Sequence, residues 1–262
     1  MSRLSISAAW DETRAFLTRE SRLVVPVALA FNVLPAVAGA MVAPAAMSLT
    51  VPRPGMFAVA LAVTVARLLG LMVITRLALG TRDRLAATIG AAARRLPPLL
   101  ALIMLVVLAA SVVAAPLMLP LVQSPADPPA GARLGLAAVG LLMLALFARL
   151  SLSVAVAVCG PGGPLAIARK SLALTRGNFW RLLGTILLLL VTMAILGKVA
   201  QLVVGSLVVM AFGRPGAWTV SRLLILLAMQ LVEVAVSVVL FVLLARLYAQ
   251  RVLATHVPSS GS

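Results

Sequence analysis

The residues of this chain that could carry acid–base or metal chemistry are few and far apart. There are only six acidic residues and one histidine among the 262 residues. They are Asp11, Glu12, Glu20, Asp83, Asp127, Glu233 and His256. A metal-dependent hydrolase needs carboxylates and imidazoles that converge on one site, and no such spacing occurs here. The sequence therefore predicts no catalytic residue, no metal site and no cofactor, and hence no enzyme.

The stretch "VCGPGGP" offers two weaker candidates for a reactive site. Cys159 has no base beside it in the sequence, so we expect a small packing residue at the end of an apolar stretch. The glycines that follow it lack the lysine and the spacing of a phosphate-binding loop. Neither feature predicts catalysis.

More informative polar residues lie within apolar stretches. Glu233 is the only acid in such a position, and Gln230 lies one helical turn before it, while Arg67 and Lys198 belong to two other stretches. Counted from the arginine that closes each stretch, Arg67 and Glu233 differ by about 6 Å along the helix axis, which an arginine side chain can reach. We therefore predict an Arg67–Glu233 pair, with Lys198 as the competing partner of Glu233. Such a pair could fix the register of two helices or line a polar interior.

The elements that carry these residues are predicted from hydropathy. The chain is 63% hydrophobic with a mean hydropathy of +1.17, far above that of soluble domains. Stretches of about 20 apolar residues, enough to cross a hydrocarbon core of about 30 Å, recur along it. We predict six membrane spans at about 23–46, 56–79, 97–121, 133–158, 182–207 and 219–247. The prolines of the first and third spans predict kinked helices.

The distribution of basic residues predicts the orientation of these spans. The net charge of +16 would suggest nucleic acid for a soluble protein, but almost no water-facing surface remains to bind it. Fifteen lysines and arginines flank the spans on the side that also holds both chain ends, against four on the other side. Because basic residues favour the cytoplasmic side, we expect a multi-pass bacterial inner-membrane protein with both termini in the cytoplasm.

One basic stretch, "GPLAIARKSLALTRGNFWRLL", predicts an amphipathic helix that lies in the headgroup layer. On a helical period Leu165, Ala168, Leu172 and Phe179 share one flank, away from the basic residues. We expect this stretch to contact anionic lipid headgroups, which are the predicted partners of the protein, or to act as a topological anchor alone. The candidate headgroup ligands are Arg169, Lys170, Arg176, Trp180 and Arg181.

Arg-Leu pairs recur at the ends of the predicted spans and indicate an internal repeat. The distance from Arg22 to Arg76 equals that from Arg95 to Arg149, at 54 residues each. We predict an all-α domain over residues 1–256, built from three pseudo-repeated hairpins at about 5–80, 82–158 and 163–250. Each hairpin would be introduced by a cytoplasmic amphipathic helix. Residues 257–262 are expected to form a disordered tail.

The stretches "AIARKSLALTRGNFWRLLG" and "SISAAWDETRAFLTRESRLVVPVALA" resemble the glycerophosphoryl diester phosphodiesterase membrane-domain family and the YciC-like, uncharacterised bacterial inner-membrane proteins. The resemblance implies six helices and a role in the cell envelope. In some family members this domain precedes a catalytic phosphodiesterase barrel, which is not expected here. The enzymatic part of the family name is therefore not carried over.

Two classes of function remain open at this point. The first is a non-enzymatic envelope protein that scaffolds or handles membrane lipid through the basic stretch. The alternative is a small transporter or lipid-translocating protein with a polar interior around Arg67, Lys198, Gln230 and Glu233.

Overall fold

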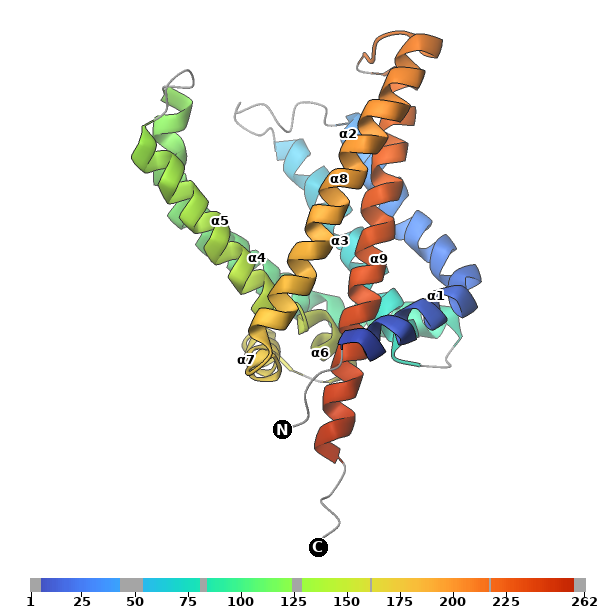
Figure 1. Cartoon of the computed structure of the whole chain (residues 1–262), viewed down its shortest axis with the longest axis vertical. Helices are drawn as coiled ribbons and strands as arrows, with labels where there is room; N and C mark the ends of the chain where they lie inside the picture. Colours follow the sequence, from blue (N-terminus) through green and yellow to red (C-terminus); the bar gives the residue numbers. More distant parts are fainter. Residues whose placement is uncertain are drawn as a thin grey trace, which may run out of the picture. The chain divides into compact units, whose positions relative to one another are not determined.

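The computed structural model describes residues 6–42, 54–80, 84–123, 129–160, 162–216 and 218–256, and this part of the chain is all-α. Of these residues 92% are helical and none lies in a strand. Six helices among them are long and apolar enough to cross a membrane, as expected for a multi-pass membrane protein (Figure 1). They are Ile6–Val42, Gly55–Ala78, Leu85–Met118, Ala130–Cys159, Phe179–Phe212 and Val220–Val252.

The chain divides into two compact units, which the sequence did not predict. One comprises Met1–Arg94 and Thr185–Ser262, and the other comprises Arg95–Gly184. Two long helices, α4 (Leu85–Gln123) and α8 (Phe179–Phe212), each contribute to both units.

The first unit is built on α9 (Val220–His256) and on the N-terminal helices that pack against it. These are α1 (Ile6–Ala28), the π-helical turn η1 (Leu29–Val33), α2 (Leu34–Val42) and α3 (Pro54–Ala78). Figure 1 shows α1 crossing α9, and Gln250 on α9 donates a hydrogen bond of 3.3 Å to Glu12 on α1 at this crossing. Fully buried apolar residues lie on α3 (Met72, Val73, Ile74) and on α9 (Val242, Leu243).

The predicted first span and the charged segment before it form one helix, Ile6–Val42, which contains a π-helical turn instead of a break. Leu34 donates its backbone N–H to the carbonyl of Leu29, five residues earlier, so the turn between them is π-helical. Pro35 follows at once and has no N–H for the ordinary bond to Phe31. The distortion expected from the prolines is thus absorbed by a wide turn between Pro26 and Pro35, a known way for a helix to bend. Pro44 lies outside the described residues.

The second unit contains most of α4 together with α5 (Ala130–Leu150), α6 (Ser153–Cys159) and α7 (Pro164–Thr175). Here the predicted fourth span, 133–158, differs from the structure because the helix is interrupted after Leu150. The Ser151 hydroxyl donates to the carbonyl of Ala148 at 2.9 Å, and the carbonyl of Arg149 is taken by Ser171. In a continuous helix the N–H of Ser153 would bond to Arg149 instead.

The expectation for Cys159 is corrected. Cys159 ends α6 with an exposed side chain, so it is not the packing residue that the sequence indicated. His256, the last residue of the predicted domain, is also the last residue of α9. The side chain of His256 and residues 257–262 lie outside the described part of the chain.

Candidate functional site

The predicted headgroup ligands form a corner between two helices, which we call the basic corner: Arg169, Lys170, Arg176, Trp180 and Arg181. α7 ends at Thr175, and α8 begins at Phe179. The turn between them passes through Gly177, whose φ of 83° is one that side-chain-bearing residues rarely adopt. Asn178 donates its N–H to Thr175 across the turn at 3.3 Å and accepts the first helical bond of α8 from Leu182 at 3.0 Å.

The end of α5 holds this corner in place through one residue. The Ser171 hydroxyl donates to the backbone carbonyl of Arg149 at 2.9 Å. The Arg149 guanidinium lies 5.0 Å from the centre of the Phe179 ring, within the range of a cation–π interaction. One residue of α5 thereby fixes both α7 and the start of α8.

All five residues of the basic corner are exposed, and Trp180 has 79% of its surface accessible. The opposite stripe of α7, formed by Ile167, Ser171 and Thr175, is buried at helical spacing. The expected apolar flank is split, because Leu165 is exposed while Leu172 is half-buried. The face of α7 that packs inward carries Ile167 and Ser171, each one residue before Ala168 and Leu172 of the predicted apolar flank.

The charges of the basic corner have no carboxylate nearby in sequence. No aspartate or glutamate occurs between Asp127 and Glu233, and among the described residues of Arg95–Gly184 there is none at all. The described residues of this unit therefore supply no carboxylate to the basic corner.

The arginine-over-phenylalanine contact occurs a second time, in the other unit. Arg246 on α9 lies 5.4 Å from the centre of the Phe16 ring on α1. Arg149 and Arg246 both belong to Ala-Arg-Leu stretches that the sequence indicated as equivalent ends of repeats. The equivalence is incomplete, because α5 ends one residue after Arg149 whereas α9 continues to His256. The threefold repeat stays a prediction.

The second candidate site lies within the spans of the first unit, and we call it the polar cluster: Arg67, Gln230 and Glu233. Arg67 on α3 forms an ion pair with Glu233 on α9, and both side chains are about one-third exposed. Gln230 donates to the other carboxylate oxygen of Glu233 at 3.1 Å. The structure thus contains the pair that helix depth predicted.

Lys198, the competing partner of Glu233, is placed elsewhere. Its ammonium group is exposed on α8 and lies 3.4 Å from the side-chain oxygen of Gln201, one turn along the same helix. The structure does not bring it to the polar cluster.

Sequence reasoning missed Asn32, which is only 3% exposed. It lies in η1 against Gly70, one turn along α3 from Arg67. Its side-chain nitrogen has no hydrogen-bond partner among the described residues, and neither has the side-chain oxygen of Gln230. An asparagine between two prolines in an apolar span was the available signal, because buried amides are costly unless bonded.

A scan against models of known protein families, a search of curated proteins and a search of solved structures each find no match to this chain. The resemblance to the phosphodiesterase membrane-domain family therefore stays a prediction.

Proposed function

We propose that this chain is a non-enzymatic inner-membrane protein that binds anionic lipid headgroups through the basic corner and so scaffolds or handles membrane lipid. The proposal rests on one observation: the four cations and the tryptophan of the basic corner are exposed, in a unit whose described residues include no carboxylate. Each lysine or arginine near an anionic leaflet contributes about 1 kcal/mol of binding free energy.

The construction of the corner supports a headgroup site over mobile basic side chains. Ser171 and Arg149 fix α7 and the start of α8 relative to α5, so the cations project from a rigid backbone. Trp180 packs edge-on against Phe179, with ring centres 5.3 Å apart, and its outer face is exposed. Tryptophan in this setting is typical of the boundary between hydrocarbon and headgroups.

The same proposal includes the orientation of the chain. An even number of spans would bring both termini to one side, and the excess of basic residues there supports the cytoplasm as that side. The basic corner would then face the anionic inner leaflet, which attracts cations close to the surface.

Removing two cations from the corner should abolish most of the stabilisation that anionic lipid provides. We expect phosphatidylglycerol, added to the purified chain in neutral detergent, to raise its melting temperature more than phosphatidylcholine does, because a ligand of the folded state stabilises it. In the Arg169→Gln/Lys170→Gln variant the apparent affinity for phosphatidylglycerol should fall about thirtyfold, the equivalent of about 2 kcal/mol.

The matched control for this experiment is Arg133→Gln/Arg214→Gln, which removes the same charge from the side predicted to face away from the cytoplasm. It should respond to phosphatidylglycerol as the unmodified chain does. Equal stability with and without anionic lipid would contradict the proposal, and so would equal losses in the two variants.

A second candidate function is transport of a small polar solute through the first unit, and the polar cluster favours it. An ion pair lies within the membrane spans, together with two amide atoms that have no partner in the described part of the chain. Such groups are costly there and commonly contact water or a solute. This candidate requires that water reaches the cluster.

Thiol labelling tests for that water. In a Cys159→Ala background, we expect a Gln230→Cys variant to react at least about tenfold faster with a charged thiol reagent than a Leu231→Cys variant, because the thiolate forms only in a polar setting. Leu231 is the neighbouring exposed residue on α9, which would face lipid. Equally slow labelling at both positions would reject a transport route through the cluster.

A further inference from the structure

A hollow of about 350 Å³ lies between α1 and α9 in the first unit. One wall is a stripe of α1 at helical spacing, and the other is Val239 of α9. The residues of the α1 stripe are Trp10, Thr13, Arg14, Leu17 and Thr18. Its volume is at the lower end of the range for ligand pockets, about 300–1,000 Å³.

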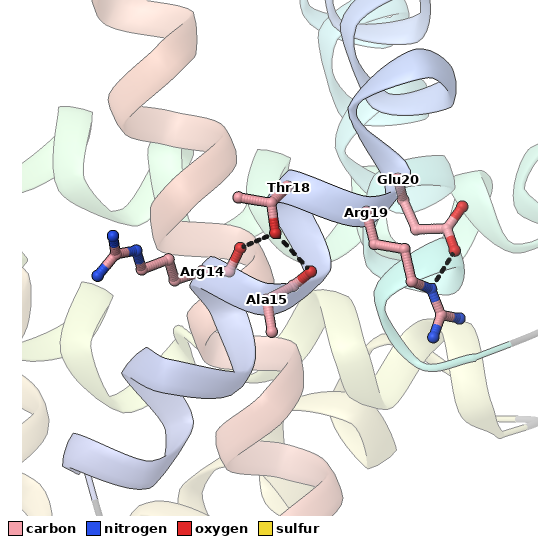
Figure 2. A network of polar contacts seen from close by, with 5 residues as sticks. All are labelled: Arg14, Ala15, Thr18, Arg19 and Glu20. Atoms are coloured by element: carbon pink, nitrogen blue, oxygen red, sulfur yellow. Dashed lines mark hydrogen bonds and ion pairs between the residues drawn. The ribbon is translucent and has the colours of Figure 1, made fainter.

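The hydroxyl groups in this wall are already satisfied within α1. Thr13 donates to the carbonyl of Ala9 at 2.7 Å. Thr18 shares its hydrogen between the carbonyls of Arg14 and Ala15, at 3.1 and 3.0 Å, as Figure 2 shows. The threonines therefore present mainly their methyl groups to the hollow, which makes its lining apolar.

Among the described residues that line the hollow, Arg14 is the one with a charge. Figure 2 shows its side chain extending away from the neighbouring Arg19–Glu20 pair, whose atoms are 3.0 Å apart. Its guanidinium group has no hydrogen bond or ion pair with any other residue that the structure describes.

The α9 wall of the hollow is apolar, and the α1 wall carries a charge. Val239 lies seven residues before Arg246 on α9 and six after Glu233, in a segment without charged residues. At 1.5 Å per residue it is about 10 Å deeper in the membrane than Arg246. α1 carries charged residues on both sides of Leu17, from Asp11 to Arg14 and from Arg19 to Arg22, which is typical of a helix at the headgroup level.

We propose that this hollow binds a membrane phospholipid, with an acyl chain along Val239 and Leu17 and the phosphate against Arg14. The apolar lining of the hollow suits the hydrocarbon chain of a phospholipid, and the guanidinium group of Arg14 suits its phosphate anion. Trp10, which is 47% exposed, would lie over the acyl chain at the boundary between hydrocarbon and headgroups, where tryptophan is favoured. The site belongs to residues other than the basic corner and does not depend on its function.

Fluorescence of Trp10 tests the proposal directly. The chain has three tryptophans, so the Trp180→Phe/Trp218→Phe variant of the full chain retains Trp10 alone. We expect brominated phosphatidylcholine, titrated into this protein in detergent, to quench Trp10 saturably near one lipid per chain. Inorganic phosphate should not compete, because it lacks the acyl chain. If inorganic phosphate displaces the lipid, the site is an anion site and the proposal fails.

Two pairs of variants separate the site from bulk lipid. Val239→Phe fills the hollow and should abolish saturable quenching, whereas Val236→Phe, a half-buried valine one turn away that does not line it, should not. Arg14→Gln should weaken binding about fivefold, and Arg22→Gln on the same helix should leave it unchanged. The Arg169→Gln/Lys170→Gln variant should also leave it unchanged, which keeps this result distinct from that of the basic corner.

The outcome that overturns the proposal is quenching that rises without saturation and is equal in all variants, since Trp10 would then report only surrounding lipid. If the Val239→Phe variant does not fold, the Arg14→Gln variant still tests whether the hollow binds the phosphate of the lipid. Arg14 is exposed, so its side chain can be replaced without disturbing the core. If the brominated lipid quenches Trp10 equally in the Arg14→Gln and Arg22→Gln variants, the phosphate contact is rejected.

Discussion

Replacing Glu233 by glutamine is expected to destabilise the protein in detergent by about 2–3 kcal/mol, and replacing Arg67 by glutamine to do so by less. The asymmetry follows from chemistry. A guanidinium group left without its partner inside the spans stays charged, whereas a lone carboxylate can bind a proton and become neutral. Unfolding monitored by circular dichroism in increasing denaturant measures both losses.

The double variant Arg67→Gln/Glu233→Gln should lose less than the sum of the two single variants, with a coupling energy of about 1–2 kcal/mol. The Arg19–Glu20 pair on α1 is the matched control, because the Arg19 side chain is 82% exposed. Its coupling should be close to zero, as for most surface pairs. Fully additive losses at Arg67 and Glu233 would show that the two residues do not interact in the folded protein.

Replacing Gly70 by alanine should cost about 2 kcal/mol, although alanine is the better helix former. A Cβ atom at this position would lie 2.6 Å from both the Cβ of Phe31 and the side-chain nitrogen of Asn32. The Phe31 atom is fixed to the backbone of η1, so α3 and η1 would have to separate. The melting temperature in detergent measures the effect.

Gly205→Ala on α8 is the control for Gly70, because a Cβ atom there meets nothing within 4 Å. It should be neutral or stabilise the protein by up to about 1 kcal/mol, the ordinary difference in helix propensity. If both alanines raise the melting temperature, the close packing of η1 against α3 is not present in the membrane protein.

The two candidate sites were predictable to different degrees. The Arg67–Glu233 pair was predicted from opposite charge and similar depth, whereas only the structure decided between Arg67 and Lys198 as the partner of Glu233. The basic corner was predictable as a set of residues but not as a structure. Nothing in the spacing of Ser171 indicated that its hydroxyl would take the carbonyl of Arg149 and end α5 there.

The sequence by itself determined the all-α class and the six apolar helices found in the described part of the chain, because the thickness of a bilayer imposes span length and hydropathy on each segment locally. Only the tertiary structure decided which faces of those helices meet. The contact of Asn32 with Gly70, the interruption after Leu150 and the hollow beside Trp10 depend on side chains far apart in the sequence. Close packing selects such contacts by shape, and a hydropathy pattern carries no information on shape.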